Sequence, residues 1–126
     1  MNDNNIYDIK IGAGSKIQNG NLLEVYYKLA VDDYKYSSLK DIKLDVTKCL
    51  EHTYNPDIPI IIKYSKGEIL DGLFNGMQGM KASGGDRRIR VPSHSAFGGR
   101  IWNKIPANTD LIIEISIAKI LPHDHQ

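Results

Sequence analysis

The chain has 126 residues, which is the length of one domain and leaves little room for a second. Hydrophobic residues make up 41% and charged residues 25%, as in ordinary soluble globular proteins. The 16 basic and 15 acidic residues give a formal net charge of +1, which excludes attraction to nucleic acid or to an anionic membrane by bulk charge.

Residues 1–5 and 122–126 are polar and are expected to be flexible tails. Between them, several segments alternate apolar and polar residues or form a short apolar run, and both patterns are typical of β-strands. The predicted strands are residues 6–11, 22–31, 41–46, 58–64, 87–91 and 110–120.

One segment has a helical pattern instead. Residues 68–80 (EILDGLFNGMQGM) place apolar side chains three and four positions apart, which predicts an amphipathic helix. Gly72, Gly76 and Gly79 each cost a helix interior about 1 kcal/mol relative to alanine, and this cost indicates close packing of the helix against a sheet. The sequence therefore predicts an α+β domain, an antiparallel sheet with one face covered by one helix.

The order of four segments resembles the FKBP family of peptidyl-prolyl isomerases. Residues 68–80 are similar to the family's helix, and residues 84–99 (GGDRRIRVPSHSAFGG) to its basic strand and the Pro-x-x-x-Ala-Tyr-Gly motif that follows. Residues 104–120 are similar to the Ile-Pro-Pro-Asn segment and final strand, and residues 24–38 to the strand carrying a pocket tyrosine. The resemblance implies one FKBP-like domain over residues 1–126, with five to six strands wrapped on one short helix.

This resemblance implies an apolar pocket that isomerises Xaa-Pro bonds without covalent chemistry, metal or cofactor, and a role as a folding helper. Four residues would act on the reacting segment, three of them through their side chains and Leu70 through its backbone N–H. Six further residues would bind the substrate. The first group is Tyr27, Tyr36, Leu70 and Phe97, and the second is Ile60, Ile69, Leu73, Trp102, Ile105 and Ile113.

Several positions depart from the family pattern. Leu73 stands where the family has a tryptophan on the pocket floor, Ser37 where it has an aspartate, and Phe97 where it has a tyrosine. Each missing hydrogen-bond donor could cost about 1–3 kcal/mol, because a buried carbonyl would be left unsatisfied. A second hypothesis is therefore a non-catalytic FKBP-like module whose remodelled pocket binds a peptide, a protein or a small apolar ligand.

The segment of about residues 39–57 is longer than in a minimal family member. It is either a surface excursion or an added recognition surface for a protein partner. Trp102 lies on the loop that overhangs the pocket in the family, so it is either a partner contact or part of a local apolar patch. The expected partners are proline-containing segments of peptides or proteins. Binding to nucleic acid or to a membrane is not expected.

The remaining basic, thiol and imidazole side chains have simpler explanations than a functional site. Arg87, Arg88 and Arg90 are interpreted as a solvated strand face rather than as a phosphate-binding site. Cys49 has no visible base to activate it, and as the only cysteine it forms no intramolecular disulfide. A metal site using His123 and His125 has too few ligands. The N-terminus has no secretory signal pattern, so a cytoplasmic location is expected.

Overall fold

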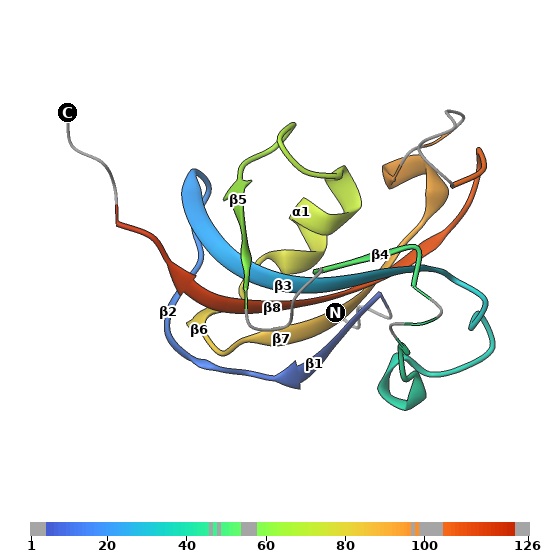
Figure 1. Ribbon diagram of the computed structural model, residues 1–126, viewed down its shortest axis with the longest axis horizontal. Helices are drawn as coiled ribbons and strands as arrows, with labels where there is room; N and C mark the ends of the chain where they lie inside the picture. The colour runs from blue at the N-terminus through green and yellow to red at the C-terminus, as the bar shows by residue number, and fades with distance from the viewer. Residues whose placement is uncertain are drawn as a thin grey trace.

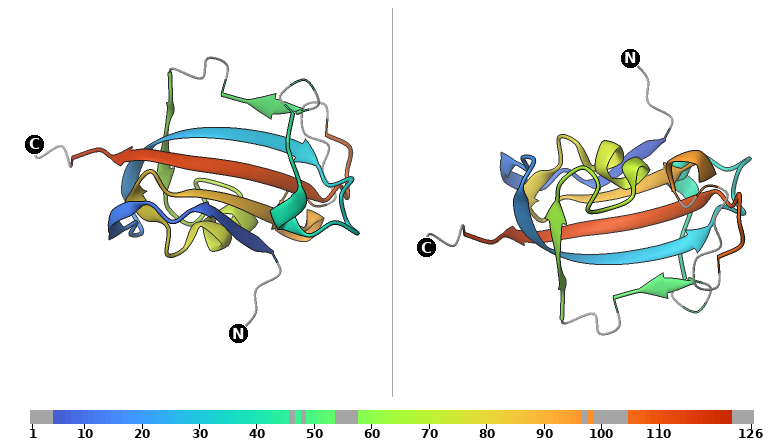
Figure 2. Two further views of the ribbon diagram at one scale, coloured as in Figure 1. Left: turned by 90° about the horizontal axis from the view of Figure 1, so that it is seen from below. Right: turned by 90° about the horizontal axis from the view of Figure 1, so that it is seen from above.

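The computed structural model describes residues 5–45, 47, 49–53, 58–96, 98 and 105–122. Within them, the main element is a six-stranded antiparallel sheet, which confirms the predicted five to six strands (Figure 1). Four of its strands lie in the order β1 (Ile6–Lys10), β7 (Asp86–Val91), β8 (Leu111–Ile120) and β3 (Asn21–Val31). The outer edge of β3 pairs first with β5 (Ile60–Tyr64) and then with β4 (Glu51–His52), which follow one another along it in Figure 2. Strands β2 (Ala13–Lys16) and β6 (Lys81–Ser83) form a separate two-stranded sheet.

Strands β3 and β8 form the centre of the sheet and separate two cores. They pair from Leu23 opposite Ile120 to Val31 opposite Leu111. Because side chains alternate between the faces of a strand, Leu29 and its partner Ile113 join the larger core on one face, while Ala30 and its partner Ile112 join a smaller core on the other.

Helix α1 (Asp71–Met77) covers the face with the larger core, above β3 and β8 in Figure 1. The predicted helix over residues 68–80 is too long at both ends. Leu70 has the extended backbone angles φ −55° and ψ 138°, and Gly79 has φ +85°, which a helix does not allow. No helix within the described residues is long and apolar enough to cross a membrane.

The glycines of α1 allow the close packing that the sequence predicts. A Cβ atom added at Gly72 would lie 2.6 Å from Cγ1 of Val91, and one added at Gly76 would lie 2.5 Å from Cγ2 of Ile89. Both partners belong to β7, so the backbone of α1 approaches the side chains of that strand more closely than an alanine would permit.

A buried arginine holds the carboxyl end of α1. Arg87 is 6% exposed, and its Nη1 donates hydrogen bonds of 2.8 Å to the carbonyl oxygens of Gly76 and Gln78. Its Nε donates at 2.6 Å to Oδ1 of Asp8 on β1. The last carbonyls of a helix have no partner within it, so Arg87 satisfies two of them and pairs its own charge at the same time.

The segment after β3 packs on the opposite face of the sheet. It contains the short 3-10 helix η1 (Leu39–Asp41), which lies below the sheet in Figure 1. Leu39, Ile42 and Leu44 are at most 6% exposed and form the smaller core with Ala30 and Ile112. The predicted strand over residues 41–46 is wrong, because the structure assigns no strand to residues 41–45, and residue 46 lies outside the described residues.

Charged side chains of β3, β7 and β8 attach this segment to the sheet. Arg88 pairs with Glu114 at 2.8 Å and donates a hydrogen bond to the carbonyl oxygen of Leu39. Lys28 pairs with Glu114 at 3.5 Å and donates at 3.2 Å to the carbonyl oxygen of Leu44. The interpretation of Arg87 and Arg88 as a solvated strand face is therefore wrong, since each is buried against a carboxylate and backbone carbonyls.

Candidate binding pocket

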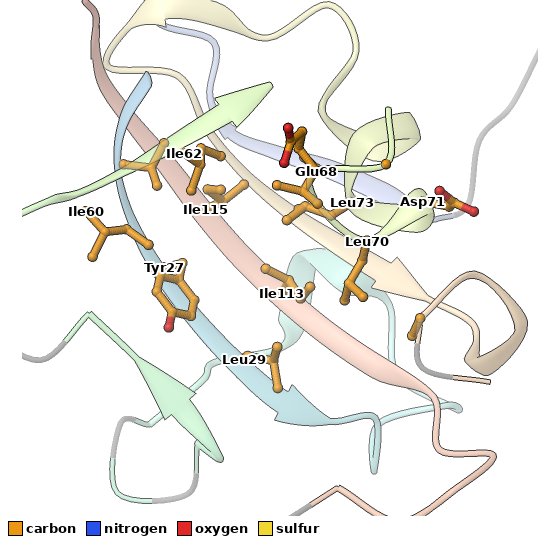
Figure 3. A pocket seen from close by; sticks show the side chains of 14 residues that line it. Tyr27, Leu29, Ile60, Ile62, Glu68, Leu70, Asp71, Leu73, Ile113 and Ile115 are labelled. Carbon is orange, nitrogen blue, oxygen red and sulfur yellow. The ribbon is translucent and has the colours of Figure 1, made fainter. Parts of the chain in front are cut away.

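An apolar cavity of about 530 Å³ lies between the sheet and α1 (Figure 3). This is within the usual size range of small-molecule and peptide pockets, about 300–1,000 Å³. Among the described residues its lining is mostly aliphatic, with one aromatic side chain and two carboxylates. The lining residues are Val25, Tyr27, Leu29, Ile60, Ile62, Gly67, Glu68, Ile69, Leu70, Asp71, Leu73, Ala96, Ile113 and Ile115.

Three strands form the floor and one wall of the cavity. Alternate residues of β3 point to the same face, which places Tyr27 between Val25 and Leu29. In the same way β8 contributes Ile113 and Ile115, and β5 contributes Ile60 and Ile62. Figure 3 shows Tyr27, Ile113 and Ile60 lying around one hollow.

The start of α1 forms the other wall. Leu70 is extended and is the residue at which the helix begins, while Leu73 lies one turn further on. Tyr64 fixes this part of the helix to β5, because its ring stacks on Phe74 with centroids 4.6 Å apart and its hydroxyl donates at 2.9 Å to the Phe74 carbonyl. Burial raises the pKa of Tyr64, so the hydroxyl keeps the proton that it donates.

The sequence of the whole core region matches a known family. A profile described as FKBP-type peptidyl-prolyl cis-trans isomerase matches residues 13–118. The chain belongs to the FKBP family.

Curated relatives of this FKBP domain are longer proteins. It is 33% identical over 115 residues to FK506-binding protein 4 of Aspergillus fumigatus, a match that covers 91% of the chain and 20% of that relative. It is 36% identical over 62 residues to FK506-binding protein 4 of Saccharomyces cerevisiae, covering 49% of the chain and 16% of the relative. The chain therefore spans about a fifth of the length of FK506-binding protein 4 of Aspergillus fumigatus and of Chaetomium thermophilum.

Solved structures share the same fold. A peptidyl-prolyl cis-trans isomerase from Pseudomonas syringae pv. tomato superposes with a TM-score of 0.69 at 20% identity, over 91% of the chain and 73% of that structure. FkpA from Escherichia coli superposes with a TM-score of 0.72 at 19% identity, over 93% of the chain and 47% of that structure.

The FKBP pocket brings together six of the ten residues that the sequence singles out. The structure places all six in its lining, and Phe97 and Trp102 lie outside the described residues. The six are Tyr27, Ile60, Ile69, Leu70, Leu73 and Ile113.

Two expected residues lie elsewhere. Tyr36 is fully exposed and lines a separate polar hollow with Lys35 and Asp110. The turn that contains it is attached to β7, because Arg90 donates hydrogen bonds of 2.5 Å and 2.8 Å to the carbonyl oxygens of Tyr34 and Ser37. Ile105 is 4% exposed and packs in the larger core without lining the pocket.

Sequence reasoning missed part of the lining although a signal was present. Alternation along β3 and β8 puts Val25, Leu29 and Ile115 on the same face as Tyr27 and Ile113, and the pocket uses all of them. Two further missed residues, Glu68 and Asp71, are the only charged residues of the lining within the described part of the chain.

Asp110 fixes the short segment that precedes Ala96 of the pocket lining. Its Oδ1 accepts a 2.7 Å hydrogen bond from the Ser93 N–H at the start of the 3-10 helix η3 (Ser93–Ser95), and its Oδ2 pairs with Lys35 at 3.1 Å. The backbone N–H of Ser93, and then Lys35, hold the pKa of Asp110 below its ordinary value.

Asp110→Asn is expected to lower the melting temperature at neutral pH, because the substitution removes the charge that these partners stabilise. A lowered pKa in the folded state contributes stability above the ordinary pKa of 3.8 and loses it as the pH falls through the folded value. Thermal unfolding from pH 7 to pH 2 should therefore show the difference between wild type and variant shrinking below about pH 4. A difference that stays constant with pH would contradict this role.

Metal and thiol chemistry find no support in the described part of the chain. No group of three or more His, Cys, Asp or Glu side chains there is close enough to hold a metal ion. His123 and His125 lie outside the described residues. Burial raises the pKa of Cys49, which donates to the Asp45 carbonyl at 3.4 Å, so its thiol is protonated at neutral pH and is a weak nucleophile.

Proposed function

We propose that this chain is a peptidyl-prolyl cis–trans isomerase that binds proline-containing segments in the cavity between α1 and the sheet. The observation that carries the proposal is the open cavity of about 530 Å³, whose lining apart from two carboxylates is almost wholly apolar. Membership of the FKBP family supports it, since six of the family's pocket positions line this cavity here.

The chemistry fits a pocket of this kind. Rotation about a peptide bond has a barrier of about 20 kcal/mol because resonance gives the bond double-bond character. The two isomers of Xaa-Pro differ by only about 1 kcal/mol, so a catalyst needs only to bind the twisted amide better than the planar forms. A twisted amide has lost resonance and carries less charge separation, so an apolar site favours it over the planar amide.

The backbone at the start of α1 supplies a hydrogen-bond donor in this proposal. The first N–H groups of a helix have no partner within the helix, and Leu70 occupies the residue at which α1 begins. Its N–H would donate to a carbonyl of the bound segment. Tyr27 and Leu73 would contact the proline ring from opposite walls.

Ile60 and Ile61 offer a matched pair for testing the proposal. They are neighbours on β5 and both are partly exposed, at 40% and 60%, but only Ile60 lines the pocket. Ile60→Asp should lower kcat/KM about tenfold or more, because it places a charge in the apolar site, whereas Ile61→Asp should leave it nearly unchanged. The readout is NMR exchange spectroscopy on Xaa-Pro peptides with different residues before proline. Equal activity of the two variants would count against this pocket as the catalytic site.

The same peptides and variants separate a second candidate function when the chemical shifts of each peptide are also followed as protein is added. A non-catalytic binding module is favoured by the aliphatic lining, in which Leu73 offers no aromatic surface to a proline ring. In that case peptide resonances would shift on binding, Ile60→Asp would abolish the shifts, and the exchange rate of every peptide would remain at its uncatalysed value.

A further inference from the structure

We infer that the pocket selects segments in which a cationic residue is next to the proline, and that Glu68 and Asp71 determine this preference. The inference rests on the proposed site, and it adds the class of segment that the site prefers. Neither residue was singled out by the sequence analysis.

Among the described residues, the charge of the pocket lining has one sign. Of the 14 lining residues, only Glu68 and Asp71 carry a charge, and both are acidic. Both residues are exposed and belong to the lining of the cavity. Figure 3 shows them apart, with Glu68 between β5 and Leu73, and Asp71 beyond Leu73. A segment whose proline enters the cavity therefore passes a negative charge on either side of Leu73.

These two carboxylates have no cationic partner among the described residues, whereas three carboxylates on or next to the sheet are paired. Asp8 pairs with Arg87, Asp32 with Arg90, and Glu114 with Arg88. No ion pair within the described part of the chain involves Glu68 or Asp71. Their charge is thus available to a ligand of the pocket.

A structural role accounts for the charge of Asp71 but not for that of Glu68. Asp71 lies in the first turn of α1, where a negative charge also favours the helix. Glu68 precedes the helix, its side chain makes no hydrogen bond to a described residue, and it lies next to Ile69 in the lining. Glu68 is therefore the clearer determinant of specificity.

No lysine or arginine of the described residues lines the pocket. Lys66 is exposed on the adjoining loop and Lys63 lies on β5, but neither of them lines the pocket. Charge complementarity between exposed groups acts mainly on specificity and association rate. We expect about a two- to fivefold preference from each carboxylate, as is usual for exposed ion pairs, and the preference should weaken as salt screens it.

The test uses two sets of three peptides. In the first set the residue before proline is lysine, glutamine or glutamate, and in the second set the same three residues follow proline. Dissociation constants come from NMR chemical-shift titration at low ionic strength, and isomerisation rates from exchange spectra of the same samples. The proteins are wild type, Glu68→Gln, the double variant Glu68→Gln/Asp71→Asn, and Asp33→Asn. Asp33 is exposed, lies outside the pocket lining and serves as the control for a loss of net charge.

The expected result is that the lysine peptide binds more tightly than the glutamine peptide, and the glutamine peptide more tightly than the glutamate peptide. This order should hold in at least one of the two peptide sets. The dissociation constant of the glutamate peptide should exceed that of the lysine peptide at least about fivefold in wild type and in Asp33→Asn. This ratio should be smaller in Glu68→Gln and near one in the double variant. Equal binding of all peptides by wild type, or a preference that survives in the double variant, would overturn the inference. Charge-dependent binding without faster exchange would support the inference while refuting the isomerase, and absence of binding to every peptide would overturn both.

Discussion

Arg87→Met is expected to lower the free energy of unfolding by about 3 kcal/mol, measured by chemical denaturation. The Arg87 side chain is only 8% exposed and joins β7, β1 and the end of α1 through one guanidinium group. Methionine fills much of the same volume but donates no hydrogen bond. The buried Gly76 carbonyl would then lose the bond from Arg87, while Asp8, whose side chain is 31% exposed, would be rehydrated.

Lys119→Met provides the comparison for this prediction. Lys119 also pairs across the sheet, with Glu24 at 3.8 Å, but its side chain is 62% exposed. Removing a surface ion pair of this kind usually changes stability by less than about 1 kcal/mol. If Arg87→Met cost no more than Lys119→Met, Arg87 would not be the helix-capping residue that its hydrogen bonds indicate.

Arg87 also shows where sequence reasoning fails. An arginine next to another arginine in a strand has the pattern of a solvated face, and nothing local predicts otherwise. Its burial depends on two helix carbonyls and on Asp8, which is 79 residues away along the chain. The positions of strands, in contrast, followed from alternation, which is a local property: β3 and β8 were predicted to within one residue at each end.

The segment after β3 could be predicted only in part. The alternation of Ile42 and Leu44 was interpreted as a strand, and both side chains are indeed buried, but their backbone pairs with no strand. Burial follows from hydrophobicity, whereas the backbone conformation follows from Arg88 and Lys28, which bind the carbonyls of Leu39 and Leu44. Partners of this kind are distant in sequence and are not encoded in a local pattern.

The pocket was predictable to the extent that family motifs coincide with regular structure. Tyr27 and Ile113 lie on central strands, and Leu70 and Leu73 lie at the start of α1, so the motifs place them reliably. Tyr36 lies in an irregular turn whose path is set by hydrogen bonds from Arg90. The motif located it in the sequence but did not determine its position in space.

Gly76→Ala is expected to destabilise the protein by about 1–2 kcal/mol, although alanine favours a helix by about 1 kcal/mol over glycine. The added Cβ would lie 2.5 Å from Cγ2 of Ile89, a β-branched side chain that is 1% exposed and has little freedom to move. The helix would therefore have to move away from β7. Since Leu70 and Leu73 begin that helix, we expect kcat/KM for an Xaa-Pro peptide to fall as well, measured at a temperature where the variant is fully folded.

Two further proteins isolate the steric cause. Asn75→Ala changes the preceding, exposed residue of the same helix and should leave stability within about 0.5 kcal/mol of wild type. Ile89→Ala removes the atom that the new Cβ would meet, so Gly76→Ala should be neutral or stabilising in that background even though Ile89→Ala alone costs about 2–5 kcal/mol. Additive losses in the double variant would mean that the contact with Ile89 is not what excludes a side chain at Gly76. A favourable coupling, with catalysis restored in parallel, would show that the distance between α1 and β7 sets both the stability of the fold and the shape of the pocket.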